Sequence, residues 1–224
     1  MPDNITYVLD HGYVRLVDSM GGDLAISRAA RVSYDAPPRE EDEKLIRYLM
    51  ENRHTTPFEA VVLTFEVKAP IFVFRQWHRH RTWSYNEVSA RYTELPEEFY
   101  VPRPESVGVQ SANNKQGRDL DAVVDPESVE RARRIMRNQN EDAFAAYRDL
   151  LREGVSRELA RSVLPLATYS RMFATVNLHN LFHFIRLRSH GHAQYEIRVY
   201  SDAMAELAKM VAPLAVKALE GLYK

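Results

Sequence analysis

An alternation of apolar and polar side chains between residues 58 and 68 constrains the fold of this chain more than any other feature. The apolar side chains take every second position from residue 61, so that Val61, Leu63, Phe65 and Val67 alternate with Thr64, Glu66 and Lys68. Successive side chains of a strand point to opposite faces of a sheet. The segment therefore predicts a strand with one buried face and one polar face.

Several other segments have the composition of strands. Residues 5–9 and 13–20 are rich in β-branched or aromatic side chains and flank an Asp-His-Gly turn, which predicts a hairpin. Residues 169–176 predict a further strand. Residues 84–92 lack a helical apolar stripe and predict an extended segment.

Helical spacing and capping residues predict the helices. Asp23 is placed to cap the first of them, and Asn177 is placed to cap a later one. The longest begins at Asp125-Pro126, and its core candidates are Ile135, Ala143, Phe144, Tyr147 and Leu151. The predicted ranges are 23–30, 40–52, 70–79, 126–152, 157–164, 177–190, 193–211 and a tail after residue 213.

The length of 224 residues suits one substantial hydrophobic core and is short for two independent domains. Strands mixed with longer helices indicate an α+β fold. We expect a single domain over residues 1–224, with a mixed or antiparallel sheet packed with several helices and a long helix in the C-terminal half. Residues 103–125 hold Pro, Gly, Gln, Asn and Ser with few large apolar groups, which predicts a mobile loop.

Composition excludes several kinds of function. The chain contains no cysteine, so disulfides, thiolate zinc sites, iron-sulfur clusters and cysteine nucleophiles are absent. The formal net charge is -1, so there is no basic field for nucleic acid and any anion site must be local. The sequence has neither a signal-peptide pattern nor a stretch of about 20 apolar residues. We expect a cytoplasmic protein that binds neither nucleic acid nor membranes.

Residues 79–92, RHRTWSYNEVSARY, hold three arginines, two serines, a histidine, an asparagine and a glutamate. Guanidinium groups suit phosphate, while Ser, Asn, Glu and His hydrogen-bond the edges of a heterocyclic ring. In an extended segment Glu87, Ser89 and Arg91 would share one face. The run predicts a nucleotide site, and the alternative is a polar edge strand that faces water.

Two other functions fit parts of the sequence. Arginines interleaved with Trp77, Trp83 and Tyr85 are typical of a single-strand nucleic-acid-binding module, although the net charge argues against it. A metal-dependent nucleotide hydrolase is suggested by eight histidines, but pairs such as His179 and His183 lack a third ligand. The sequence also has no GxGxxG or GxxxxGK[ST] phosphate loop. We expect no metal site.

The run resembles the RHR…S…RY signature of flavin-dependent thymidylate synthases. Other segments are similar to that family as well: HTTPFE from His54, KAPIFVFRQWHRHR, ELARSVLPL with Arg161, Asn177, and LRSHGHAQYEIR around Arg188. Thr55, Ala60 and His179 differ from residues that can stand there in the family, which affects only peripheral flavin contacts.

The resemblance implies an enzyme that methylates dUMP to dTMP in dTMP biosynthesis. The carbon donor would be 5,10-methylenetetrahydrofolate, and the hydride donor would be tightly bound FAD that NADPH reduces. It also implies a homotetramer with active sites at subunit interfaces. A hydride-based route suits this chain, because it has no thiolate to attack the uracil ring.

The resemblance also assigns site residues. Those expected to hold dUMP are Gln76, Arg79, Glu87, Ser89, Arg91, Arg161 and Arg188. Arg188, supplied by a neighbouring subunit, is the catalytic candidate, because a cation beside the pyrimidine stabilises negative charge on the ring. Ser89 is expected to be a binding hydroxyl, since spacing assigns it no base. Those expected to hold FAD are His54, Thr56, Glu59, Arg79, His80, Arg81, Glu87, Asn177, His183 and His192.

Overall fold

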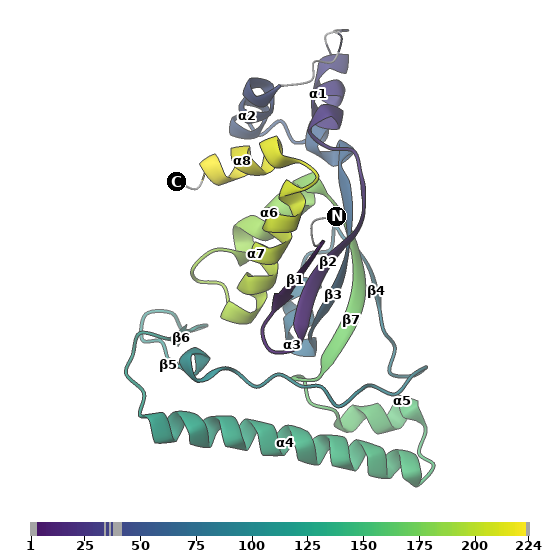
Figure 1. The fold of residues 1–224 in the computed structure, drawn as a ribbon, viewed down its shortest axis with the longest axis vertical. Coiled ribbons are helices and arrows are strands. Elements are labelled where there is room, and N and C mark those ends of the chain that lie inside the picture. The colour runs from purple at the N-terminus through teal and green to yellow at the C-terminus, as the bar shows by residue number, and fades with distance from the viewer. Residues whose placement is uncertain (1–3, 34, 36, 38–41, 223–224) are drawn as a thin grey trace.

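The computed structural model describes residues 4–33, 35, 37 and 42–222, and its centre is a five-stranded antiparallel sheet (Figure 1). The strand order is β1-β2-β3-β7-β4. The strands are β1 (Ile5–Val8), β2 (Gly12–Met20), β3 (Val62–Pro70), β7 (Tyr169–Asn177) and β4 (Ser84–Glu87). The predicted hairpin, the alternating strand and the strand near residue 169 are confirmed.

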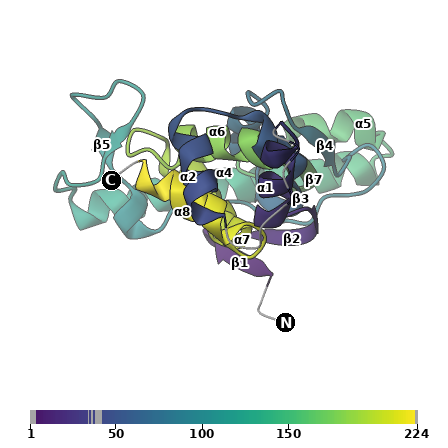
Figure 2. The same cartoon turned by 90° about the horizontal axis from the view of Figure 1, so that it is seen from above.

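The alternation in β3 decides which face of the sheet is buried. Leu63, Phe65 and Val67 are fully buried and belong to the main core. Helices α6 (Leu178–Arg188) and α7 (Tyr195–Lys209) cover this face, and α8 (Pro213–Gly221) packs against α7. Helices α1 (Asp23–Val32) and α2 (Glu43–Glu51) lie near α8 at one end of the sheet (Figures 1 and 2). Residue 40, the predicted start of the second helix, lies outside the described residues.

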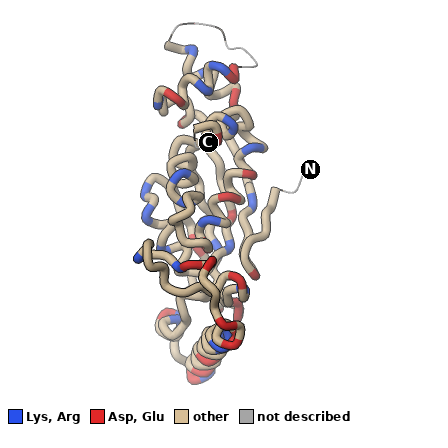
Figure 3. The backbone as a smooth tube through the Cα atoms, turned by 90° about the vertical axis from the view of Figure 1, so that its left-hand side faces the viewer, with Lys and Arg blue, Asp and Glu red and all other residues tan. Residues whose placement is uncertain are grey.

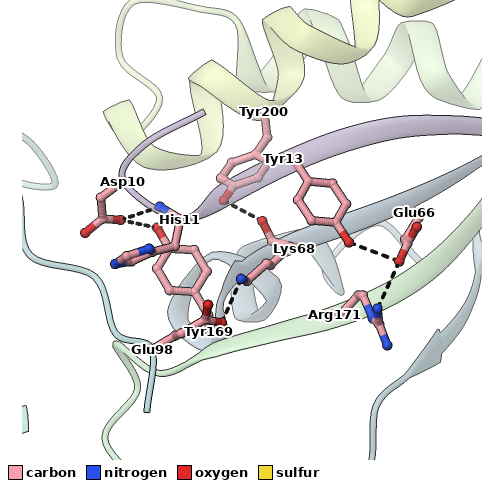
Figure 4. Close-up of polar contacts among 9 residues, drawn as sticks. All are labelled: Asp10, His11, Tyr13, Glu66, Lys68, Glu98, Tyr169, Arg171 and Tyr200. Carbon is pink, nitrogen blue, oxygen red and sulfur yellow. Dashed lines mark hydrogen bonds and ion pairs between the residues drawn. The ribbon is translucent and has the colours of Figure 1, made fainter. Parts of the chain in front are cut away.

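The opposite face of the sheet carries charged pairs (Figure 4). Glu66 accepts a hydrogen bond from the Tyr13 hydroxyl at 3.0 Å and forms ion pairs with Arg15 and Arg171. Beside it, Lys68 Nζ lies 2.7 Å from Glu98 Oε2. A buried carboxylate is strongly destabilising unless it is paired, so these partners allow β3 to alternate between core and polar side chains.

The long helix in the C-terminal half is confirmed as α4 (Pro126–Arg152), which lies beyond one end of the sheet (Figure 1). Asp125 caps it by accepting a hydrogen bond from Ser128 N–H at 3.0 Å. Phe144 and Tyr147 are buried in a second, smaller core cluster. The prediction that Ile135 belongs to the core is wrong, because this cluster lies along the C-terminal half of α4 and Ile135 is 63% exposed.

The helix at Asp23 is confirmed, but the predicted capping role of its side chain is wrong. The Asp23 carboxylate accepts hydrogen bonds from Leu214 N–H at 2.9 Å and Ala215 N–H at 3.0 Å, at the start of α8. Burial raises the pKa of Asp23, while these two hydrogen bonds oppose the shift. The sequence pattern suggested a local cap, whereas tertiary packing brings the start of a helix distant in sequence to this carboxylate.

The run that follows β3 is less extended than its sequence suggests. The helix predicted over residues 70–79 is confirmed as the shorter α3 (Ile71–Trp77), which Pro70 precedes as the last residue of β3, and β4 then ends at Glu87. From Ser89 the chain turns, because Ser89 O accepts the amide hydrogen of Tyr92 at 3.0 Å. Glu87 and Arg91 are therefore not successive members of one strand face.

Residues 103–125 contain short regular elements of their own. These are the 3-10 turn η2 (Pro104–Ser106) and the small hairpin of β5 (Val109–Gln110) and β6 (Arg118–Asp119). The mobility of this segment remains a prediction. Charged residues of both signs are interspersed along the chain (Figure 3), in keeping with a net charge of -1.

Candidate functional site

Two buried tryptophans hold the segment that joins α3 to β4. Trp77 is fully buried, and its ring lies 4.8 Å from that of Phe184 and 5.9 Å from that of Trp83. Between the tryptophans His80 points inward and is 7% exposed. Its neighbours Arg79 and Arg81 are exposed. The RHR triplet therefore presents two exposed cations on either side of a buried imidazole.

Gln76, His80 and Arg188 meet at the end of α6, and we call them the Arg188 group. Arg188 Nε donates a hydrogen bond to His80 Nε2 at 3.0 Å, and Arg188 Nη2 donates one to the backbone carbonyl of Gln76 at 3.2 Å. Burial, aided by the charge of Arg188 and by His183, lowers the pKa of His80 to about 4. His80 is therefore neutral at pH 7, as its acceptor role toward Arg188 requires.

Ser89, Arg91 and Arg161 form a second group, the Arg91 group, around Glu158. Arg91 Nη2 lies 3.4 Å from Glu158 Oε2, and Arg161 Nε donates to the Glu158 carbonyl at 3.4 Å. Ser89 Oγ accepts the Arg91 amide hydrogen at 3.3 Å. The Arg91 and Glu158 side chains are 49% and 67% exposed, so this ion pair contributes little stability. An anionic ligand could replace the carboxylate at small cost.

The two groups are separate within one chain. Among the described residues, no hydrogen bond or ion pair joins the Arg188 group to the Arg91 group. Arg161 stands at the start of the 3-10 turn η3 (Arg161–Val163), which follows α5 (Arg157–Ala160). In Figure 1, α5 and the α6–α7 connection lie on opposite sides of the sheet. Glu87, at the end of β4, contributes to neither group.

A cleft of about 510 Å³ lies beside α6 and contains two of the predicted FAD residues. His54 and His183 line it, together with the cations Arg53 and Arg186. Burial lowers the pKa of His183, with Arg186 and His179 adding to the effect. The cleft thus offers imidazole and two guanidinium groups, a combination that suits the diphosphate of a dinucleotide.

The remaining predicted FAD residues are distributed over neighbouring elements. Thr56 and Glu59 are exposed on the 3-10 turn η1 (Thr56–Ala60), which contacts α6. Asn177 caps α6, as predicted, and its Oδ1 accepts the Asn180 amide hydrogen at 2.9 Å. The structure does not bring His192 to the cleft of His54. His192 lines a different cleft of about 710 Å³ between residues 108–121 and 191–198.

Among the described residues, no three His, Asp or Glu side chains come close enough to hold a metal ion. Within the same part of the chain, no helix is both long and apolar enough to cross a membrane.

Sequence reasoning assigned no role to several side chains that contact predicted site residues or are linked to them through hydrogen bonds. Gln194 and Glu196 stand in the HGHAQYEIR segment, and Gln194 accepts a hydrogen bond from Gln76 Nε2. Their presence in that segment was the available signal. Glu158 is the first residue of the ELARSVLPL segment, which was its available signal. Arg118 carried no signal, because a charged residue in a polar loop is usually only solvated.

The fold and these side chains define an α+β protein with an arginine-rich site suited to a nucleotide. The family model described as thymidylate synthase complementing protein (Thy1) matches residues 15–214. A flavin-dependent thymidylate synthase of Treponema pallidum is 50% identical over 219 residues, which cover 97% of this chain and 72% of that protein. One from Thermus thermophilus is 53% identical over 215 residues, covering 95% and 77%.

The chain is also similar to solved structures. The crystal structure of the UMP/dUMP methylase PolB from Streptomyces cacaoi, bound with 5-Br dUMP, is similar with a TM-score of 0.83 and 38% identity. The match covers 95% of this chain and 96% of that one. The chain belongs to the flavin-dependent thymidylate synthase family and is an enzyme.

Proposed function

We propose that this enzyme methylates dUMP to dTMP, with 5,10-methylenetetrahydrofolate as carbon donor and NADPH-reduced FAD as hydride donor. The observation that carries the proposal is the Arg188 group, in which a half-buried guanidinium is held beside Gln76 by a neutral His80. A fixed cation of this kind stabilises negative charge that develops on a pyrimidine ring as its C5 becomes nucleophilic. The relatives described above are thymidylate synthases or dUMP methylases by name, which supports the same substrate.

Each group is proposed to bind a different part of dUMP. The exposed arginines of the Arg91 group suit its phosphate, with the Ser89 hydroxyl beside them, because guanidinium groups bind phosphate in a planar, bidentate way. The Arg188 group suits the uracil ring, which needs donors and acceptors at fixed positions. Arg79 and Glu87 complete the proposed set of dUMP contacts.

The side chains near α6 fit FAD. Arg53, Arg186 and the exposed Arg79 and Arg81 offer cations for its diphosphate, and imidazoles line the cleft of about 510 Å³. Bound FAD would supply the hydride that a chain without cysteine needs for this methylation. The proposed FAD contacts are His54, Thr56, Glu59, Arg79, His80, Arg81, Glu87, Asn177, His183 and His192.

The active form is proposed to be a homotetramer with sites at subunit interfaces. The separation of the Arg188 and Arg91 groups within one chain supports this, because one nucleotide must contact both. A second copy would bring its Arg188 group to the Arg91 group of the first. We also propose a cytoplasmic location, since the proposed substrates are soluble nucleotides and folates.

Absorption spectroscopy and product analysis test the proposal. We expect purified protein to bind FAD with a visible spectrum that dUMP perturbs. NADPH should reduce the flavin, and dTMP should form only when the folate is present. Protein that binds neither FAD nor dUMP would refute the proposed function. Activity that a chelator abolishes would favour a metal-dependent nucleotide hydrolase instead.

A further inference from the structure

Glu196, at the start of α7, is a buried carboxylate that accepts hydrogen bonds from three side chains. Its side chain is 1% exposed. Oε1 accepts from the Tyr100 hydroxyl at 2.9 Å and from Arg118 Nη2 at 2.8 Å, and Oε2 accepts from Gln194 Nε2 at 2.8 Å. All three partners donate, so this carboxylate acts only as an acceptor.

An acceptor in this position fixes the direction of two amides. A glutamine side chain has donors on its nitrogen and an acceptor on its oxygen. Because Glu196 takes the Gln194 nitrogen, Gln194 must turn its oxygen away, and that oxygen accepts a hydrogen bond from Gln76 Nε2. Gln76 is thereby left with its own Oε1 free. No donor among the described residues reaches this oxygen.

Gln76 also accepts a hydrogen bond from Arg188 Nη2 on its backbone carbonyl, at 3.2 Å. The Arg188 group therefore combines an acceptor with guanidinium donors. Uracil offers the complementary pattern on its imide edge, where a ring N–H stands between carbonyl oxygens. Cytosine offers a ring nitrogen that accepts and an amino group that donates, so it would leave the Gln76 oxygen and the guanidinium mismatched.

We infer that Glu196 is a positioning residue, which sets the direction of the Gln194 and Gln76 amides so that the site accepts a uracil edge and disfavours a cytosine edge. The inference rests on the proposed function, because it takes Gln76 and Arg188 as the side chains that bind the ring. Glu196 itself touches no substrate and acts through Gln194.

The substitution Glu196→Gln is expected to reverse the orientation of the Gln194 and Gln76 side-chain amides. The new side chain keeps its oxygen toward Tyr100 and Arg118, so its nitrogen faces Gln194. Gln194 must then turn its oxygen to residue 196 and its nitrogen to Gln76, and Gln76 presents its nitrogen to the site. We expect the affinity for dUMP to fall about tenfold and the preference for dUMP over dCMP to fall by a similar factor, as for one lost and mismatched hydrogen bond.

A double variant that combines Glu196→Gln with Gln194→Glu restores the direction without restoring the original residues. Its carboxylate at position 194 accepts hydrogen bonds from the new amide at position 196 and from Gln76, so the Gln76 oxygen again faces the site. We expect the preference for dUMP to return. Tyr100→Phe is the matched control, because it removes one donor to Glu196 without reversing any amide, and its preference should match that of wild type.

Isothermal titration calorimetry of the full chain with dUMP and with dCMP measures these ratios, and thermal unfolding verifies that each variant is folded. Loss of preference in Glu196→Gln with recovery in the double variant supports the inference. A folded Glu196→Gln variant with the wild-type ratio overturns it, and so does a folded double variant that remains as unselective as the single one. Wild-type protein that binds no dUMP would instead refute the proposed function.

Discussion

The Arg188 group and the Arg91 group place similar side chains in opposite surroundings. Arg188 is half-buried and hydrogen-bonded to His80 and to a backbone carbonyl, while Arg91 is 49% exposed and pairs with Glu158, which is 67% exposed. The first is fixed before any ligand arrives. The second is held only by a weak surface ion pair. The difference indicates that ring chemistry depends on the rigid group and that anion capture depends on the adaptable one.

Arg188→Ala gives the largest expected effect. Removing a fixed cation beside the reacting ring should reduce the rate of dTMP formation about 10²- to 10³-fold, a loss typical of a missing transition-state donor. The free energy of unfolding should change by about 1 kcal/mol or less, because the side chain is not part of the apolar core. Turnover assays and chemical denaturation measure the two quantities.

Arg152→Ala is the matched control for this variant. The Arg152 side chain is 75% exposed at the end of α4 and pairs with Asp149. Its turnover should equal that of wild type. Near-normal dTMP formation by Arg188→Ala would remove Arg188 from the chemistry and erase the proposed distinction between the groups.

Acid should weaken the rigid group by protonating His80. The pKa of His80 is lowered to about 4 from an ordinary 6.5, so between these values the unfolded chain binds more protons than the folded one. Stability rises with pH where the unfolded state binds more protons. The free energy of unfolding should therefore fall as pH drops from 6.5 toward 4, by on the order of 3 kcal/mol at most.

Denaturation curves between pH 7 and pH 4 measure this fall for wild type and for His80→Gln. The glutamine keeps an acceptor for Arg188 Nε but has no imidazole to protonate. The free energy of unfolding of His80→Gln should therefore not show this fall. Both His183 and Arg188 face the imidazole and contribute to its lowered pKa. Equal pH dependence in the two proteins would show that His80 does not titrate as described.

Arg91→Ala and Arg161→Ala should act mainly on binding. Each removes one exposed cation proposed to contact phosphate, so we expect KM for dUMP to rise about 10-fold while kcat changes little. The effect should shrink at high ionic strength, since exposed charges are screened by salt. Steady-state kinetics at low and high salt would measure this. A large fall in kcat with unchanged KM would contradict the division of roles between the groups.

Patterns over adjacent residues predicted most of the fold. The alternation in β3 and the Asp125-Pro126 start of α4 depend on local chemistry, and both are confirmed. Features that depend on tertiary packing were missed. Asp23 caps α8 instead of its own helix, and the shared contact of Arg91 and Arg161 with Glu158 joins residues about seventy positions apart. The orientation of the Gln194 and Gln76 amides likewise depends on hydrogen-bond partners that the spacing of residues in the sequence does not reveal.

Glu158→Gln gives the smallest expected effect and tests how loosely the Arg91 group is held. The pair is exposed, so the free energy of unfolding should change by about 0.5 kcal/mol or less. Removing the negative charge frees Arg91 for phosphate, and dUMP affinity should rise about 2- to 3-fold at low salt. Titration of dUMP measures this, with Glu153→Gln as the control for loss of one exposed carboxylate. A fall in affinity would mean that Glu158 orients Arg91 for the ligand, and the Arg91 group would then be as preorganised as the Arg188 group.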